Sequence, residues 1–167
     1  MRSRAGESIM KRALYIGVFD PINLGHLDII ERAGRLVDEL VIGVLANPQI
    51  STDIPVTERI RIVKKAVNHI ENVEVIQFQG AMMDFIKTHD INLCVRGLRM
   101  MSDFEYELNI VQVYSQLEDG LDTVFLTTNE IYANYSSREV RQIAKNHGNI
   151  EKFLPACIIN DVKSIYV

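Results

Sequence analysis

Short apolar runs alternate along the chain with segments whose apolar residues recur at helical spacing. Residues 13–19 form an apolar run without helical period that ends at Asp20 and Pro21, which is typical of a buried strand. In residues 27–37 the apolar positions share one helical face and charged residues fill the other. Continued along the chain, these two patterns predict strands at 40–46, 73–78, 91–95 and 121–127, and helices at 56–70, 82–88, 103–117, 136–147 and 155–165.

The alternation of strands with helices predicts the fold class. Parallel strands are joined by right-handed crossovers, which carry the connecting helices onto the faces of the sheet. We therefore expect an α/β fold with a five-stranded parallel sheet that is covered by helices on both faces.

The predicted helix at 103–117 has two apolar stripes instead of one. One stripe packs against its own sheet, and the other needs a cover, so we expect an oligomer contact there. The stripes are Phe104, Leu108 and Val111 on one side, and Tyr106, Ile110, Val113 and Leu117 on the other.

Composition limits the class of protein. With 167 residues, 47% of them hydrophobic, the chain suits one folded domain at 11–167, preceded by an N-terminal extension or leader at 1–10. The net charge of −4 provides no overall basic field, so we expect neither nucleic acid nor a membrane as a partner. Cys94 and Cys157 both lie in apolar runs, which predicts two reduced thiols packed in the core. Without a signal peptide or a spanning segment, the expected location is the cytoplasm.

The end of the first strand is a candidate anion site. Gly25 and His26 fall in the first turn of the next helix, where free backbone N–H groups and a partial positive charge favour a phosphate. A P-loop and a GxGxxG fingerprint are both absent from the sequence. Taken alone, the same residues also fit an ordinary helix start with a surface histidine.

Three ordered blocks resemble a known family. Residues 17–21 together with Gly25-His26 look like the signature of the nucleotidyltransferase superfamily with a T/HxGH motif. Residues 96–99 and 103–107 are similar to the second signature of the bacterial phosphopantetheine adenylyltransferase family, and residues 135–141 resemble its third. Their order and spacing agree with that family from about residue 11 to the C-terminus.

The resemblance implies a dinucleotide-binding-like (Rossmann-like) nucleotidyltransferase domain that assembles as a homohexamer. The family transfers AMP from ATP to 4′-phosphopantetheine, which gives dephospho-CoA and pyrophosphate in coenzyme A biosynthesis. It uses Mg²⁺ that arrives with ATP, and we expect no dedicated metal ligand on the protein. The attacking phosphate oxygen is already ionised at neutral pH, so positioning and charge stabilisation suffice without a general base.

Carried over by position, the resemblance assigns roles to individual residues. His26 is the catalytic residue, Arg96 holds the acceptor phosphate and Met82 lies near the pantetheine arm. ATP contacts fall on Val18, Phe19, His26, Gly97, Leu98, Arg99, Glu107, Tyr132, Ala133, Asn134, Tyr135, Ser136, Ser137 and Arg138. These assignments also have plain structural alternatives: Arg96 and Arg99 as exposed charges at a strand end, Met82 as a core residue, Glu107 as part of a polar helix face, and Ser136 and Ser137 as helix-capping residues.

The chain departs from the family pattern at three positions. Val18 stands where the family has a threonine that touches both substrates, and Ile50 stands where a lysine binds the acceptor phosphate. Asn23 replaces the first residue of the T/HxGH motif. The first two changes leave the ATP side intact and weaken the acceptor side. Two alternative hypotheses follow: a paralogue that binds nucleotide or CoA with low turnover, or a nucleotidyltransferase that uses a different phosphorylated acceptor.

Overall fold

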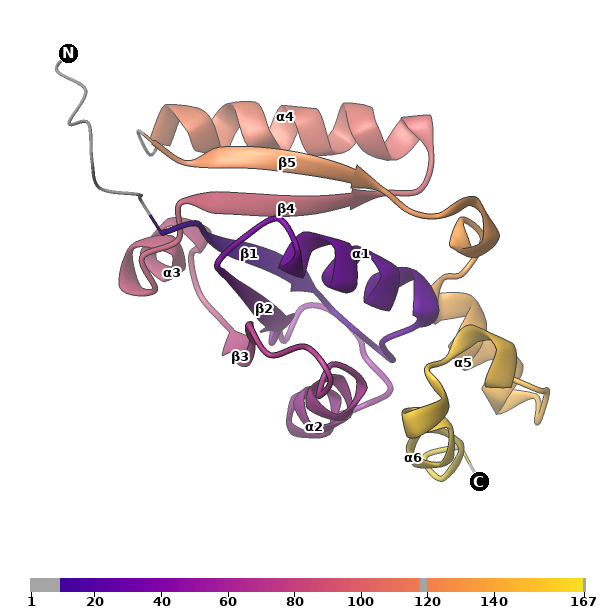
Figure 1. Ribbon diagram of the computed structural model, residues 1–167. Helices are drawn as coiled ribbons and strands as arrows, with labels where there is room; N and C mark the ends of the chain where they lie inside the picture. The colour runs from indigo at the N-terminus through magenta and orange to yellow at the C-terminus, as the bar shows by residue number, and fades with distance from the viewer. Residues whose placement is uncertain (1–9, 118–119, 167) are drawn as a thin grey trace, which may run out of the picture.

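The computed structural model describes residues 10–117 and 120–166, with the side chains of residues 115 and 117 excepted (Figure 1). The extension expected at 1–10 therefore lies outside the described residues, apart from Met10. The same holds for the side chain of Leu117 in the second stripe.

The centre of the molecule is a five-stranded parallel sheet with the strand order β3-β2-β1-β4-β5 (Figure 1). This confirms the expected fold class. β1 lies in the middle, so its carboxyl end and that of β4 face the position where the strand order reverses. The strands are β1 (Arg12–Gly17), β2 (Glu39–Leu45), β3 (Val73–Phe78), β4 (Leu93–Leu98) and β5 (Asp122–Thr127).

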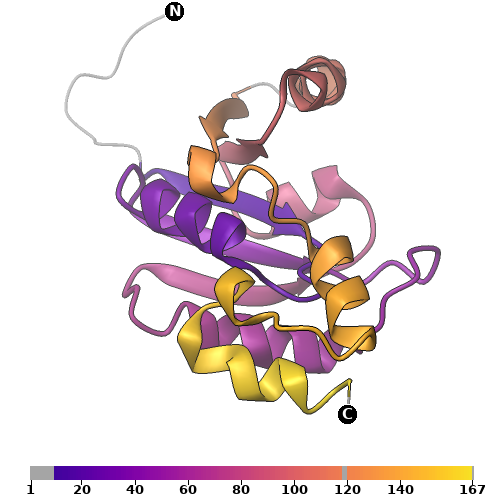
Figure 2. The same cartoon turned by 90° about the vertical axis from the view of Figure 1, so that its right-hand side faces the viewer.

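Helices cover both faces of the sheet, and the two faces have separate cores (Figure 2). Side chains of α1, α2, α5 and α6 join the larger core, while α3 packs into the smaller one on the opposite face. The helices are α1 (Leu24–Gly34), α2 (Val56–Ala66), α3 (Met82–Thr88), α4 (Met101–Leu117), α5 (Ser137–Lys145) and α6 (Ile159–Lys163), with 3₁₀ turns at Glu130–Tyr132, Glu151–Phe153 and Ala156–Ile158. None of the helices in the described ranges is long and apolar enough to cross a membrane.

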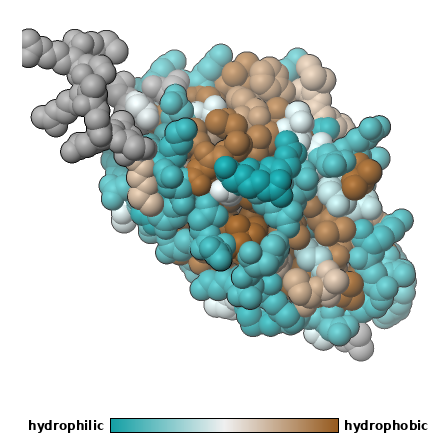
Figure 3. Space-filling view, viewed as in Figure 1, coloured by the Kyte–Doolittle hydropathy of each residue, from teal (hydrophilic) through white to brown (hydrophobic). Residues whose placement is uncertain are grey.

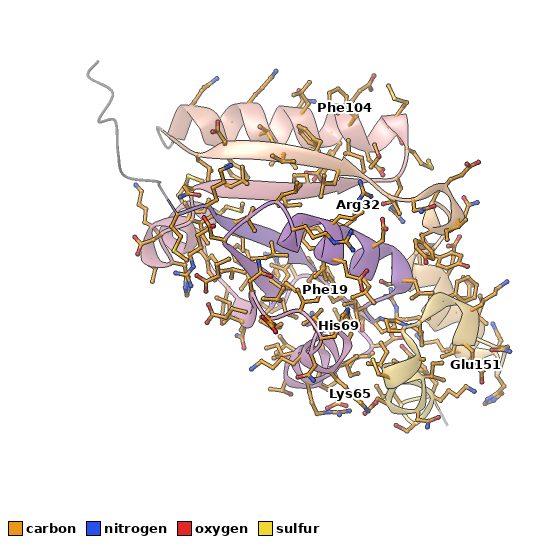
Figure 4. The ribbon with its side chains drawn as sticks, in the orientation of Figure 1. Phe19, Arg32, Lys65, His69, Phe104 and Glu151 are labelled. Atoms are coloured by element: carbon orange, nitrogen blue, oxygen red, sulfur yellow. The ribbon has the colours of Figure 1, made fainter. Side chains whose placement is uncertain are left out.

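α4 lies along the edge of the sheet. Phe104 packs edge-on against Phe125 of β5, with ring centroids 5.4 Å apart, so the first predicted stripe does face the sheet (Figure 4). On the second stripe Tyr106 is 68% exposed and Val113 57% exposed. Apolar surface is visible over α4 and β5 at the top of the space-filling view (Figure 3).

Several predicted boundaries and one core residue were wrong. β4 runs on to Leu98, beyond the predicted end at 95, because its ladder with β5 continues up to the pair Leu98–Thr127. The helix predicted at 56–70 ends at Ala66. α1, capped by Asn23, does hold Gly25 and His26 in its first turn as expected. Cys157 is exposed, and its thiol donates to the carbonyl of Lys65, whereas Cys94 is buried as expected.

Candidate active site

A cavity of about 330 Å³ opens at the carboxyl ends of β1 and β4. It brings together residues from all three sequence blocks: His26 from the first, Gly97 and Arg99 from the second, and Ser136 from the third. The full lining is Tyr15, Val18, Phe19, Asn23, Gly25, His26, Ile29, Gly97, Arg99, Thr128, Tyr135, Ser136 and Ser137. Residues as far apart in the chain as Tyr15 and Ser137 thus meet at the place where α/β sheets bind their ligands.

His26 is held at the start of α1 by a reciprocal pair of hydrogen bonds with Asn23. The Asn23 side chain accepts the backbone N–H of His26 at 3.0 Å, and the backbone N–H of Asn23 donates to Nδ1 of His26 at 3.2 Å. Because a backbone N–H only donates, Nδ1 must be the unprotonated nitrogen, and Nε2 carries the proton. His26 is therefore a hydrogen-bond donor through Nε2.

The surroundings keep His26 neutral. Burial, and after it the positive charge of Arg99, lower the pKa of the imidazole to about 4. A histidine with that pKa is uncharged at neutral pH. In this state its Nε2–H is a hydrogen-bond donor without a charge, and Arg99 is the cationic side chain of the cavity lining.

Asn23 also connects the first block to the third. Its Nδ2 donates to the backbone carbonyl of Tyr135 at 3.3 Å, while its Oδ1 caps α1. The departure from threonine or histidine at this position is thus accommodated by an amide that both accepts and donates.

The amino end of α5 borders the same cavity. Ser136 caps the helix by accepting the backbone N–H of Glu139 at 3.2 Å, and the Ser137 hydroxyl donates to the carbonyl of Pro21 at 2.8 Å. A second hollow of about 580 Å³ next to it is lined by Arg99, Ala133, Asn134, Arg138 and others. Two exposed guanidinium groups therefore stand beside a helix start, an arrangement suited to a polyphosphate.

Gly97 and Arg96 lie on opposite faces of the sheet because side chains alternate along a strand. Gly97 lines the main cavity, on the side of α1. Arg96 pairs in register with Phe125, on the side of α4, and its Nε lies 3.5 Å from Oε2 of Glu107. Among the described residues that carboxylate oxygen is buried without a hydrogen-bond partner.

The residues assigned to the acceptor are more scattered than those assigned to ATP. Met82 packs at the edge of the smaller core, on the same face as Arg96. Ile50 lies in the loop after β2, is 37% exposed and lines none of the cavities described here. Leu98 borders an apolar hollow beside α4, and Tyr132 lies next to Gly25.

Sequence reasoning missed several residues at or near the site, including Ile29 and Thr128 of the cavity lining. Tyr15 lines the floor of the cavity, and burial raises the pKa of its phenol, which stays protonated as a donor. Side chains two residues apart on a strand share a face, so Tyr15 lies on the same side of β1 as Gly17. This alternation in the sequence could have identified Tyr15. Arg59 and Arg141 do not line the cavity but bind the carbonyls of Val18 and Asp20 beside Phe19 of its lining. Arg141 belongs to the third sequence block, yet neither arginine was singled out.

Comparison with known proteins identifies the family of the chain. The model of the cytidylyltransferase-like family matches residues 14–143. A phosphopantetheine adenylyltransferase of Clostridium botulinum (strain Alaska E43 / Type E3) is 45% identical over 153 residues, covering 92% of this chain and 96% of the relative. One from Lachnoclostridium phytofermentans is 45% identical over 157 residues, covering 94% and 96%.

Solved structures support the fold. A putative nicotinate-nucleotide adenylyltransferase from Vibrio parahaemolyticus superposes with a TM-score of 0.68 at 13% identity, covering 95% of this chain and 96% of that one. At this identity the likeness concerns the fold alone. The identity and coverage of the curated relatives confirm the resemblance seen in the three blocks, and the chain belongs to the phosphopantetheine adenylyltransferases, within the cytidylyltransferase-like family.

Proposed function

We propose that this protein transfers the adenylyl group of ATP to 4′-phosphopantetheine, which yields dephospho-CoA and pyrophosphate in coenzyme A biosynthesis. Family membership supports this reaction. The observation that carries it is the meeting of His26, Arg99 and the amino ends of α1 and α5 around one cavity. Such a site suits the transfer of a phosphoryl-type group between two anions.

In the proposed reaction His26 donates from Nε2 to an oxygen of the α-phosphate. Charge on that oxygen grows in the transition state, so the hydrogen bond becomes stronger there than in the ground state. Arg99 and Arg138 bind the β- and γ-phosphates, which leave as pyrophosphate. The acceptor phosphate is ionised already, so the site needs no base.

Mg²⁺ enters with ATP in this proposal. Within the described residues, no group of three or more His, Cys, Asp or Glu side chains is arranged to hold a metal ion. An ion that arrives on the nucleotide would neutralise charge on its phosphates.

Arg96 is the proposed ligand of the acceptor phosphate. Its contact with Glu107 is an ion pair of 3.5 Å, and both side chains are mostly buried, at 16% and 22% exposed. Glu107 therefore keeps the guanidinium in place before the acceptor arrives. Met82, on the same face, is placed to contact the pantetheine arm.

The test is release of pyrophosphate by the purified protein. With millimolar ATP and Mg²⁺, release is expected to require 4′-phosphopantetheine and to be absent with pantetheine, which lacks the attacking phosphate. Mass spectrometry of the product identifies dephospho-CoA. No phosphopantetheine-dependent product would refute the proposal.

A second function is favoured by Val18 and Ile50, whose side chains carry no hydrogen-bond donor, and by the lack of any basic residue in 47–58. On this alternative the protein binds nucleotide or CoA with weak turnover, or uses a different phosphorylated acceptor. A turnover on the order of 1 s⁻¹ or above would exclude weak turnover. Calorimetric titration with ATP and then phosphopantetheine separates these cases.

We also propose a cytoplasmic homohexamer. The exposed side chains of Tyr106 and Val113 on α4 support an assembly that covers them. Sedimentation at micromolar concentration tests this, and a monomer would refute it.

A further inference from the structure

Phe19 has a backbone conformation that a phenylalanine rarely adopts. Its φ is +50°, in the left-handed region where a side chain with a Cβ is strained. The ring is only 2% exposed and lies in the interior below α1 (Figure 4). A Cβ on Gly17 would lie 2.7 Å from Cζ of Phe19, so the glycine makes room for the ring. Strain at one residue persists only where surrounding contacts hold it.

Two arginines hold the carbonyl groups on either side of Phe19. Arg59 of α2 donates from Nη1 to the carbonyl of Val18 at 2.6 Å, and Arg141 of α5 donates from Nη1 to the carbonyl of Asp20 at 2.6 Å. Hydrogen bonds from a charged donor are shorter and stronger than neutral ones. The turn at Phe19 is therefore held from two directions. Arg59 lies 41 residues after its partner Val18, and Arg141 lies 121 residues after its partner Asp20.

The carboxylate of Asp20 supplies a negative charge opposite the guanidinium of Arg141. This carboxylate is 1% exposed, lies 3.2 Å from Nη1 of Arg141 and accepts the backbone N–H groups of Asp53 and Ile54 at 2.9 Å. A buried carboxylate with three such partners is satisfied and rigid. Arg141 thus contacts both the side chain and the carbonyl of the same residue.

The turn at Phe19 also supports the imidazole of His26. The rings of Phe19 and His26 meet edge to face, with centroids 5.2 Å apart and an angle of 79°. Movement of Phe19 would remove that ring contact and leave the imidazole free to rotate away from the backbone N–H of Asn23, whose hydrogen bond to Nδ1 selects the tautomer.

We propose that Arg59 and Arg141 are positioning residues for adenylyl transfer, which act through the turn at Phe19 to hold His26 with its Nε2 proton directed at the phosphate. This inference rests on the proposed function for its catalytic consequence. Neither arginine lines the cavity itself.

Arg141→Met tests the inference, with Lys145→Gln as the matched control. Lys145, one helical turn further along α5, pairs with Asp53 at 2.6 Å, so its substitution removes a cation from the same cluster and leaves the carbonyl of Asp20 bound. Two readouts are compared: steady-state kinetics, and the long-range ¹H–¹⁵N spectrum of the His26 ring in the protein without substrates.

In Arg141→Met we expect kcat to fall at least tenfold, KM for both substrates to change less than threefold, and His26 to show a mixture of tautomers. Lys145→Gln is expected to stay within twofold of the wild type in both readouts. Arg141→Lys, whose single ammonium can reach both the carbonyl and the carboxylate of Asp20, is expected to restore kcat to within about threefold of the wild type and to restore the tautomer. If Arg141→Met does not fold, Arg141→Gln takes its place in the same comparison.

The inference would be overturned if Arg141→Met had the same kcat and the same His26 spectrum as the control Lys145→Gln. A loss of kcat in Arg141→Met with an unchanged His26 spectrum would also overturn it. The His26 spectrum is recorded without substrate. A wild-type protein that makes no dephospho-CoA would therefore refute the proposed function, while the spectrum still decides whether Arg141 positions His26.

Discussion

The imidazole of His26 and the backbone N–H of Asn23 form a hydrogen bond of 3.2 Å that leaves Nε2 as the protonated nitrogen. The return bond from the His26 backbone to the Asn23 side chain, at 3.0 Å, completes a cap on α1. The contacts that begin the helix are therefore the ones that set which imidazole nitrogen of the proposed catalytic residue carries the proton.

Replacement of His26 by alanine is expected to lower kcat by roughly 10²–10³, the range seen when one donor to a developing oxyanion is removed. The dissociation constant for ATP should change less than threefold, because the hydrogen bond strengthens mainly in the transition state. Steady-state kinetics and calorimetry measure the two effects. His69→Ala, which removes an exposed imidazole paired with Glu31, is the control. Equal losses in turnover and ATP binding would show that His26 acts in ground-state binding.

The lowered pKa of His26, about 4, has consequences for pH dependence. As pH falls from the ordinary histidine value of about 6.5 towards 4, the unfolded state takes up the proton before the folded state does, so folding loses stability. Above about pH 6.5 this contribution to stability is complete. Titration by NMR should give a His26 midpoint near 4, and Arg99→Gln should raise it because one lowering charge is gone. A midpoint near 6.5 in the wild type would contradict the neutral-donor role.

The acceptor side is expected to improve when the two departures are reversed. Ile50→Lys combined with Val18→Thr should tighten binding of 4′-phosphopantetheine by about ten- to a hundredfold, since a hydrogen bond to a charged group is worth roughly 1.5–3 kcal/mol. Calorimetry of the acceptor measures this. Ile50→Gln with Val18→Thr is the neutral control and should gain less. Unchanged affinity in the lysine variant would mean that the loop after β2 does not reach the acceptor.

Gly17→Ala is expected to destabilise the fold and the site together. The added Cβ would lie 2.7 Å from Phe19, so the ring must move, at a cost of about 1–3 kcal/mol in the free energy of unfolding. Turnover should fall as well, because the Phe19 ring supports His26. Gly34→Ala, whose Cβ would meet its neighbours at 3.4 Å or more, is the control. Urea unfolding measures the loss of stability and steady-state kinetics measure the loss of turnover. A Gly17→Ala protein with wild-type stability and turnover would contradict the close packing at Phe19.

Much of the fold could be predicted because it depends on local patterns. The apolar run before Asp20 is β1, and the segment Met82–Thr88 is a helix at its predicted bounds. The three sequence blocks identified the family, and His26, Gly97, Arg99 and Ser136 do line one cavity. Ser136 both caps α5 and borders the cavity, so the structural and the binding roles are compatible there.

Other properties depended on contacts between distant residues. Arg96 and Gly97 are neighbours in the chain but lie on opposite faces of the sheet, which separates Arg96 from the cavity around His26. Cys157 was predicted to be buried from its apolar neighbours and is exposed, because the helical turn there directs it outwards to the carbonyl of Lys65.

The sequence by itself determined the order of strands and helices and the family, because hydrophobic period and short motifs are written in neighbouring residues. Only the tertiary structure decided the left-handed turn at Phe19, the tautomer of His26 and the parts played by Arg59 and Arg141. The physical reason is that a strained backbone and a protonation state are set by whichever donors surround them. Here two of those donors come from helices 41 and 121 residues away along the chain.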